Sequence, residues 1–363
     1  MKIFLFYAIN LRLKKISSFA ASIISVFIFQ FIFLTNSNSE ENKSKYYSND
    51  EGILSLMYHR FNENKYPSTN IQMKVFKDQM EMIKNSNYTF SNPKQFIENF
   101  NTSKSNKEIL ITIDDAFLSF YLEAWPYLKK NKIPFILFVS TEPVGKRGYM
   151  TWEQIKEVEA EKFTVIGHHS HSHGYLIDND DNFFISDIKK ANEIFLKNLG
   201  YIPNLFSYPF GEYSKFMRDY ISQNFDYAFG QHSGVIDLNK DKFELPRFPI
   251  NENYGKLKRF YSIINSFPLE YEQLLPLEKK LSAESNPPNF KVKFFKEQDN
   301  IKNINCYSNE LDKWEKSDST FNNNMLTIKF RGPFKPRRGR INCSLNDNGK
   351  WRWFGIQFPV KEN

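Results

Sequence analysis

The sequence has few cysteines, no glycine-rich phosphate loop after its first expected strand, and no recognisable nucleic-acid-binding module. Its only two cysteines, Cys306 and Cys343, allow at most one intramolecular disulfide. The missing phosphate loop argues against a doubly wound sheet that binds a dinucleotide. The formal net charge of +8 is mild for 363 residues, so it favours anionic surfaces such as membranes or acidic glycans without specifying one of them.

Apolar residues, in contrast, are plentiful. They make up 41% of the chain, and aromatic residues make up 17%. This is enough to build a packed core in a chain of this length. We therefore expect a folded protein with one large domain and one small domain.

The first 35 residues predict a membrane-inserting segment. Four basic residues precede an uncharged run at 16–35 that is rich in Phe and Ile. Such a run is about long enough to span a bilayer, and its basic flank would stay in the cytoplasm, so the rest of the chain is expected to be exported. No clear cleavage site follows, which leaves both a signal peptide and an N-terminal membrane anchor open for 1–35, with a buried core helix as a third alternative. The polar residues 36–50 predict a disordered tether.

Strands and helices are expected to alternate through residues 51–275. Strands are expected at 53–59, 109–113, 133–139 and 163–166, and helices at 75–84, 94–100, 117–130, 152–159, 185–199 and 217–224. Pro126 must kink or split the helix at 117–130. This alternation predicts an α/β fold, a parallel (β/α) barrel, in which functional residues collect at the carboxyl ends of the strands.

The pattern changes after residue 275. Residues 276–289 are interpreted as a linker, and 290–363 contain short alternating runs with an Asn348-Gly349 hairpin signal. We expect a small all-β sandwich-like accessory domain here. Cys306 and Cys343 lie in two of its expected strands, so in an exported protein they should be bridged, although two free buried thiols are the alternative. Six basic residues could bind an acidic polymer or form a solvated loop: Lys329, Arg331, Lys335, Arg337, Arg338 and Arg340.

A cluster of histidines follows the expected strand at 163–166. Four of the six histidines lie within residues 168–173. His169 and His173 stand four apart, so on a helical turn their rings would share one face. Asp115, after the strand at 109–113, could supply a carboxylate. Two imidazoles and one carboxylate suit Zn²⁺ or another divalent transition metal and leave a position for water, whereas a solvated histidine-rich loop is the alternative. Asp114 could serve as a base if a cation held its charge.

Three segments resemble a known family. Thr-Ile-Asp-Asp-Ala-Phe at 112–117, His-Ser-His-Ser-His at 169–173 and Ser-Tyr-Pro-Phe-Gly at 207–211 are similar, in order and spacing, to the first three motifs of the NodB-type polysaccharide deacetylases, carbohydrate esterase family 4. The resemblance covers about residues 52–265. It implies a distorted (β/α)7 barrel, a metal held by one Asp and two His, and removal of N-acetyl groups from amino sugars of a glycan. Met-Tyr-His at 57–59 and Leu-Pro-Arg at 245–247 further resemble the branch that acts on exported poly-N-acetylglucosamine.

The resemblance also implies roles for particular residues. By motif position, Asp114 would be the base, and the backbone N–H of Phe210 would be an oxyanion donor. The metal ligands would be Asp115, His169 and His173. Ser207 replaces the arginine that usually pairs with the base, and Arg247 could take over that role; a surface or interdomain ion pair is the alternative for Arg247. The usual Leu-His motif is not evident, so His232 is the first candidate for the general acid and His59 the second.

Three functions remain open from the sequence. The first is a metal-dependent N-deacetylase that acts on an envelope or exported polysaccharide. The second is a catalytically weak or inactive glycan-binding protein of the same fold, and the third is a metallohydrolase that acts on another amide. The expected partners are an N-acetylated polysaccharide and, through residues 16–35, a membrane, but no nucleic acid. The expected location is the bacterial cell envelope, periplasmic or extracellular, with attachment to the inner membrane if 1–35 is retained.

Overall fold

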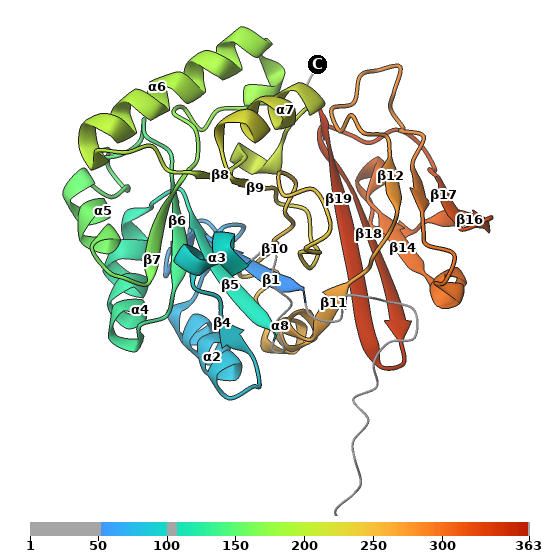
Figure 1. Ribbon diagram of the computed structural model, residues 1–363, viewed down its shortest axis with the longest axis horizontal. Helices are drawn as coiled ribbons and strands as arrows, with labels where there is room; N and C mark the ends of the chain where they lie inside the picture. The colour runs from blue at the N-terminus through green and yellow to red at the C-terminus, as the bar shows by residue number, and fades with distance from the viewer. Residues whose placement is uncertain (1–51, 100–106, 362–363) are drawn as a thin grey trace, which may run out of the picture. The chain divides into compact units, whose positions relative to one another are not determined.

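The computed structural model describes residues 52–99 and 107–361 (Figure 1). The predicted signal peptide or anchor at 1–35 and the predicted tether at 36–50 lie outside these residues. Among the helices that the structure describes, none combines the length and apolar character needed to span a bilayer.

The central element is a parallel sheet of eight strands in the order β10-β1-β5-β6-β7-β8-β9, with β4 paired to β5. Phe229, at the end of β9, forms an isolated parallel bridge with Leu245, and the chain then continues into β10, which pairs with β1. The sheet is therefore a distorted parallel α/β barrel, as predicted. Its strands are β1 (Ile53–Tyr58), β4 (Thr89–Phe90), β5 (Glu108–Asp114), β6 (Phe135–Val139), β7 (Thr164–His168), β8 (Leu205–Ser207), β9 (Tyr227–Phe229) and β10 (Phe248–Pro249).

Helices α2, α4, α5 and α6 lie along the outside of this sheet (Figure 1). Apolar residues at helical spacing give α2 one buried face, which includes Phe76, Met80 and Ile83. The helices of the described residues are α2 (Met73–Lys84), α3 (Pro93–Asn99), α4 (Trp125–Asn131), α5 (Trp152–Glu159), α6 (Asp181–Leu199), α7 (Lys215–Asn224) and α8 (Leu257–Ile264). Short helical turns are η1 (Phe120–Ala124), η2 (Leu176–Asp178), η3 (Pro209–Gly211), η4 (Asp299–Asn303) and η5 (Glu310–Asp312), and a small separate pair is formed by β2 (Arg60–Phe61) and β3 (Asn70–Ile71).

Local signals fix several helix ends. Thr151 caps α5 in a capping box with Gln154, and Gly200 ends α6 with a left-handed φ of 84°, so both expected termini are confirmed. The helix expected at 117–130 is split, as predicted: a π-helical turn, η1, directly precedes α4. Pro126 is the second residue of α4 and lies next to this interruption.

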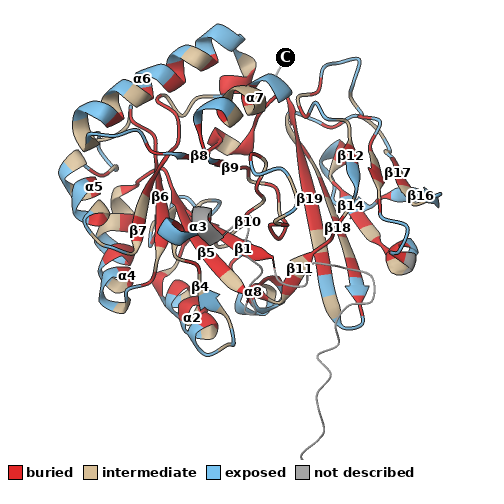
Figure 2. Ribbon diagram, viewed as in Figure 1, coloured by how far each residue is buried: buried red, intermediate tan, exposed pale blue. Residues whose placement is uncertain are grey.

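Both faces of the barrel strands are covered. All six residues of β1 are buried, as are six of the seven in β5, and Figure 2 shows buried residues along the central strands. Continuous apolar runs are typical of parallel strands that pack against other elements on both faces.

The C-terminal part forms two β-sheets that share one apolar core, as expected for a sandwich. One sheet contains β11 (Ser266–Pro268), β19 (Lys350–Val360), β18 (Arg337–Asp347), β14 (Asn305–Ser308) and β15 (Glu315–Lys316), in that order. The other contains β12 (Gln273–Leu275), β13 (Lys291–Lys293), β17 (Met325–Lys329) and β16 (Asp318–Asn322). Asn348 and Gly349 form the two-residue turn between β18 and β19 with positive φ angles, as predicted. Two strands, β11 and β12, precede the linker predicted at 276–289; the division into domains stays a prediction.

Most of the basic cluster is paired within the protein. Arg331 contacts Glu310 and Glu315, and Lys335 contacts Asp312. Arg337 and Arg338 both bind Glu212, a residue of the barrel. These arginines therefore connect elements of the fold instead of forming a solvated loop.

The two cysteines form the predicted disulfide. Cys306 in β14 lies directly opposite Cys343 in β18, with their Cα atoms 4.0 Å apart. The bridge closes a loop with a sequence separation of 37 residues inside the sandwich core.

Replacing both cysteines with alanine is expected to lower the free energy of unfolding by about 4 kcal/mol, because the unfolded chain then regains the entropy of the open loop. Denaturant unfolding of the two proteins, with and without reductant, measures this difference. Reductant should destabilise only the original protein. Two free thiols in the unfolded, unreduced protein would contradict the bridge.

Candidate metal centre and catalytic site

Two neighbouring aspartates end β5 and turn in different directions. Asp114 is the last residue of the strand, whereas Asp115 and Ala116 have φ angles of 75° and 52°. Regular strand geometry would send the two carboxylates to opposite faces, so this left-handed turn redirects Asp115. Ala116 lies at a position where the NodB-type deacetylases that the sequence resembles usually have glycine. Because alanine has a Cβ atom, its left-handed conformation costs on the order of 1 kcal/mol.

The histidine motif follows β7. Gly167 must be glycine, because a Cβ atom there would lie 2.3 Å from Cδ1 of Phe138. The expectation that His169 and His173 lie on a helical turn is wrong: the segment is an irregular turn in which Ser170 and His173 have positive φ angles. This turn nevertheless brings the two rings together, with their centroids 4.9 Å apart.

Asp115, His169 and His173 converge into one cluster. Oδ1 of Asp115 lies 3.0 Å from Nε2 of His173 and 3.4 Å from Nε2 of His169. The potential ligand atoms all lie within 4.8 Å of one another, and this is the one group of three or more such residues found in the described ranges.

The cluster fits a divalent metal ion. Both Oδ1 of Asp115 and Nε2 of His169 are buried without a hydrogen-bond partner among the described residues. Unpaired buried polar atoms are costly, and a metal ion would satisfy both. Burial favours a higher pKa for Asp115, but His173 and His169 outweigh it and hold this pKa well below the ordinary value, so the carboxylate is available as a ligand.

A neighbouring carbonyl orients His169. Nδ1 of this histidine lies 2.6 Å from the backbone oxygen of Ser207, the last residue of β8. A carbonyl only accepts, so Nδ1 carries the proton and Nε2 presents its lone pair toward Asp115.

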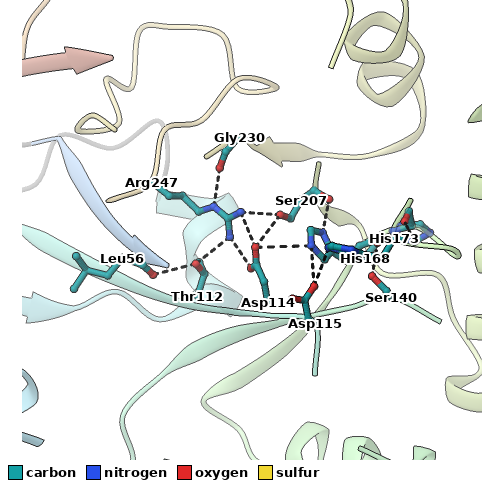
Figure 3. A network of polar contacts seen from close by, with 12 residues as sticks. Leu56, Thr112, Asp114, Asp115, Ser140, His168, His173, Ser207, Gly230 and Arg247 are labelled. Atoms are coloured by element: carbon teal, nitrogen blue, oxygen red, sulfur yellow. Dashed lines mark hydrogen bonds and ion pairs between the residues drawn. The ribbon is translucent and has the colours of Figure 1, made fainter. Parts of the chain in front are cut away.

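Asp114 and Arg247 form a buried bidentate ion pair beside this cluster (Figure 3). Nη1 and Nη2 of Arg247 donate to the two carboxylate oxygens at 2.7 and 2.8 Å, and both side chains are fully buried. Nη2 also donates to Oγ of Ser207 at 2.8 Å. The small Ser207 leaves space for the guanidinium, which explains how an arginine from another segment can reach Asp114.

Two further groups hold the guanidinium in place. Nε of Arg247 donates to the backbone oxygen of Gly230 at 2.9 Å, and Nη1 donates to Oγ1 of Thr112 at 3.1 Å. Thr112 in turn donates to the backbone oxygen of Leu56. We did not predict the part that Thr112 plays, although a threonine between two isoleucines in a strongly apolar strand was a signal for it.

The ion pair keeps Asp114 ionised. Burial alone would raise the pKa of its carboxyl, but Arg247, with smaller effects from His169 and His59, holds the pKa below its ordinary value. Asp114 is therefore a carboxylate that can accept a proton.

Phe210 lies against the cluster through its contact with His173. It belongs to η3 and has a left-handed φ of 58°. Its ring packs edge-on against His173, with the centroids 4.7 Å apart. The residue whose N–H was predicted to serve as the oxyanion donor is thus adjacent to a candidate ligand.

The two candidates for the general acid lie in different surroundings. His59 interacts electrostatically with Asp115, Asp114 and His169, although burial lowers its pKa. The ring of His232 instead folds back over Gly230 and lines a pocket with Glu244 and Trp353. Burial, with Lys279 nearby, lowers the pKa of His232 to about 4. This location does not support the prediction that His232 is the general acid.

Comparisons with known proteins agree with this fold and site. Residues 101–228 match the family described as Polysaccharide deacetylase. The Putative polysaccharide deacetylase YxkH of Bacillus subtilis (strain 168) is 27% identical over 165 residues, which are 44% of this chain and 57% of that protein. The Poly-beta-1,6-N-acetyl-D-glucosamine N-deacetylase of Staphylococcus aureus (strain MSSA476) is 21% identical over 249 residues, covering 61% of this chain and 86% of that protein.

A solved structure shares the barrel. The Streptococcus pyogenes deacetylase PplD in complex with acetate has a TM-score of 0.54 and 20% identity, and the match covers 59% of this chain and 99% of that one. Residues 101–228 are thus similar to the polysaccharide deacetylase family, a class of hydrolases. The Asp-His-His cluster is consistent with a divalent metal site.

Proposed function

We propose that this protein is a metal-dependent hydrolase that removes N-acetyl groups from the amino sugars of an exported or envelope polysaccharide. The observation that carries the proposal is the buried pair of Asp114 and Arg247 directly beside the cluster of Asp115, His169 and His173. A binding protein would have no need for an ionised, fully buried carboxylate next to a metal site. A hydrolase needs such a group as a base.

The cluster would hold the metal through Oδ1 of Asp115 and the Nε2 atoms of His169 and His173. A divalent ion such as Zn²⁺ would there polarise a carbonyl oxygen and lower the pKa of water. The protein itself fixes the ligand set, because Ser207 sets the tautomer of His169 and the Asp115 turn aims the carboxylate.

The remaining steps are assigned to protein groups. Asp114 accepts a proton from the water molecule that attacks the acetamide carbon, and Arg247 keeps this carboxylate ionised and oriented. The backbone N–H of Phe210 donates to the oxyanion that forms. His59 protonates the nitrogen as the C–N bond breaks, so the products are acetate and a free amine. His59 directly follows Tyr58, which pairs with Ile113 next to Asp114, and its pKa is influenced by Asp114 and Asp115; this place beside the cluster supports His59 over His232.

Exposed aromatic residues support a sugar polymer as substrate. Tyr66 is 39% exposed and lies against the guanidinium of Arg60, which also covers Phe117. Tyr175 is 39% exposed and stacks on Phe210, which contacts His173. The exposed parts of such rings can contact the apolar surfaces of sugars. Export of the chain is supported by the disulfide.

The test is to incubate the purified protein with Zn²⁺ and a panel of N-acetylated oligosaccharides and to measure acetate and free amine. We expect equal amounts of both products, loss of activity with a chelator and recovery on addition of metal. Asp114→Asn is the matched control, since it should bind metal and glycan without turnover. Glycan binding without product would support the inactive binding protein. Cleavage of other amides alone would support the third function.

His59→Gln is expected to lower kcat by about 100-fold or more, because general acid catalysis typically contributes 10²–10⁴-fold. His232→Gln, the same change in the other candidate histidine, should leave kcat within about threefold if that residue takes no part in proton transfer. Steady-state kinetics on both variants compare the two. The reverse order of effects would return the role of general acid to His232.

A further inference from the structure

The turn that carries Phe210 is held in an unfavourable backbone conformation. We call residues 209–212 the Phe210 turn. Phe210 and Gly211 have successive left-handed φ angles of 58° and 67°. A Cβ atom on Gly211 would lie 2.5 Å from the backbone nitrogen of Gln231, so this position requires glycine. Phe210 has no such freedom, and a bulky residue stays left-handed only when its surroundings hold it there.

The surroundings that hold this turn belong to the C-terminal sandwich. Nε2 of Gln357, in β19, donates to the backbone oxygens of Phe210 and Gly211 at 3.0 and 3.1 Å. Arg340 donates to the Oε1 atom of the same side chain, which fixes the amide so that its donor group faces the turn. One side chain of the sandwich thus binds two successive carbonyls of the Phe210 turn.

The last residue of the turn is fixed by two arginines of β18. The carboxylate of Glu212 is 3% exposed and accepts from Nη2 of Arg337 at 2.9 Å and from Nε of Arg338 at 2.8 Å. Arg337 also donates to Asp178 of η2 at 2.5 Å. Because Glu212 is buried, these contacts are shielded from solvent and from salt. We call Arg337, Arg338 and Gln357 the hairpin clamp.

A continuous series of ring contacts leads from the clamp to the metal cluster. The guanidinium of Arg337 lies 3.8 Å from the ring centroid of Tyr175, and this ring stacks on Phe210 at 4.3 Å. Phe210 in turn contacts the ring of His173 at 4.7 Å. The same residues therefore restrain both the predicted oxyanion donor and one candidate metal ligand.

We propose that the hairpin clamp is a positioning device for the hydrolytic site, which holds the Phe210 turn and the ring of His173 in the geometry that the reaction requires. The inference rests on the proposed function and assigns the sandwich a part in it. The clamp residues do not touch the reacting atoms, so they are positioning residues. The barrel alone would then lack a support that its strained turn needs.

The test compares three variants. Gln357→Leu removes both hydrogen bonds to the turn at similar volume, and Arg338→Met removes one arginine from Glu212. Arg331→Met is the matched control, because Arg331 pairs with Glu310 and Glu315 inside the sandwich. Glu212→Gln, which keeps the shape of the carboxylate, serves as the alternative if Arg338→Met does not fold. Arg338→Lys keeps a positive charge near Glu212, so it should retain part of the activity that Arg338→Met loses.

Two readouts decide the test, kcat and amide hydrogen exchange at the turn, and KM and metal content are measured as controls. We expect Gln357→Leu and Arg338→Met to lower kcat by about 10- to 100-fold, since small displacements of positioned groups have effects of this size. KM should change by less than about threefold and the metal content should be unchanged, because neither sugar-binding rings nor ligands are removed. Amide hydrogen exchange at Gly211 and Glu212, whose N–H groups bind Tyr208 and Pro209, should become faster.

Arg331→Met should leave both readouts unchanged even if it lowers the melting temperature. Unchanged kcat and unchanged exchange in Gln357→Leu and Arg338→Met would overturn the inference, as would equal effects in Arg331→Met. If the original protein hydrolyses no substrate, the proposed function fails, yet hydrogen exchange still decides whether the sandwich holds the turn.

Discussion

His169→Ala is expected to abolish both metal binding and deacetylase activity, and Asp115→Ala is expected to do the same. Either change leaves only two protein ligands, whereas catalytic zinc sites generally use three. The structure adds a reason: Oδ1 of Asp115 and Nε2 of His169 are buried without a hydrogen-bond partner within the described residues, so both atoms are available to bind an ion. Metal analysis of the purified variants should give close to no bound ion, and kcat should fall to the background rate.

The histidine motif itself offers the control. Nδ1 of His171 lies 2.8 Å from Oγ1 of Thr141 and takes no part in the cluster. His171→Ala should therefore keep its metal and most of its activity. A full complement of metal in His169→Ala or in Asp115→Ala would contradict the assignment of these residues as metal ligands.

Arg247→Met should retain the metal but lower kcat by about 10²- to 10⁴-fold, the range attributed to acid–base catalysis. The guanidinium is the only side-chain cation seen to hydrogen-bond Asp114 in the part of the chain that the structure describes. Without it, burial raises the pKa of Asp114. The acid limb of the kcat profile, where this carboxyl must lose its proton, should move to higher pH.

The free energy of unfolding of Arg247→Met must be measured together with its kinetics, because removing one partner of a buried ion pair can cost about 3–5 kcal/mol. The pKa of Asp114 is lowered on folding, so the pair stabilises the fold above the ordinary carboxyl pKa, and this contribution is lost as the pH falls through the lower, folded value. The double variant Asp114→Asn, Arg247→Met leaves no unpaired charge and should recover stability without recovering activity. Full turnover with an unchanged pH profile in Arg247→Met would show that another group holds the base.

The barrel and most of the cluster could be predicted because their signals are local. Apolar runs that end in polar residues indicate the strands. Because parallel strands bring their carboxyl ends together, the sequence alone predicts that Asp115 and His169 lie close to each other. The contact of Arg247 with Asp114 was expected only through a resemblance, since these residues lie far apart in the chain. The structure shows why it is possible: Ser207 leaves room between the strands.

What could not be predicted depends on backbone conformation and tertiary contacts. The turn from Ser170 to His173 adopts left-handed angles that no residue type in it requires, so a regular helical turn was the natural expectation. Strand β16 offers no alternating pattern from which it could be predicted, because all five of its residues are exposed. His232 sits at a strand tip like the other site residues, yet its ring folds over Gly230, a detail without a sequence signal.

The parallel pairing of β11 with β19 affects how the protein reaches its final form. The ribosome makes β11 shortly after the barrel, but its partner comes only after β12 to β18, so the pairing has a high contact order and should close late in folding. Until then the edge of β11 is open to other chains, and open strand edges promote aggregation. The yield of folded protein should therefore depend on how quickly the last hairpin follows the barrel in synthesis.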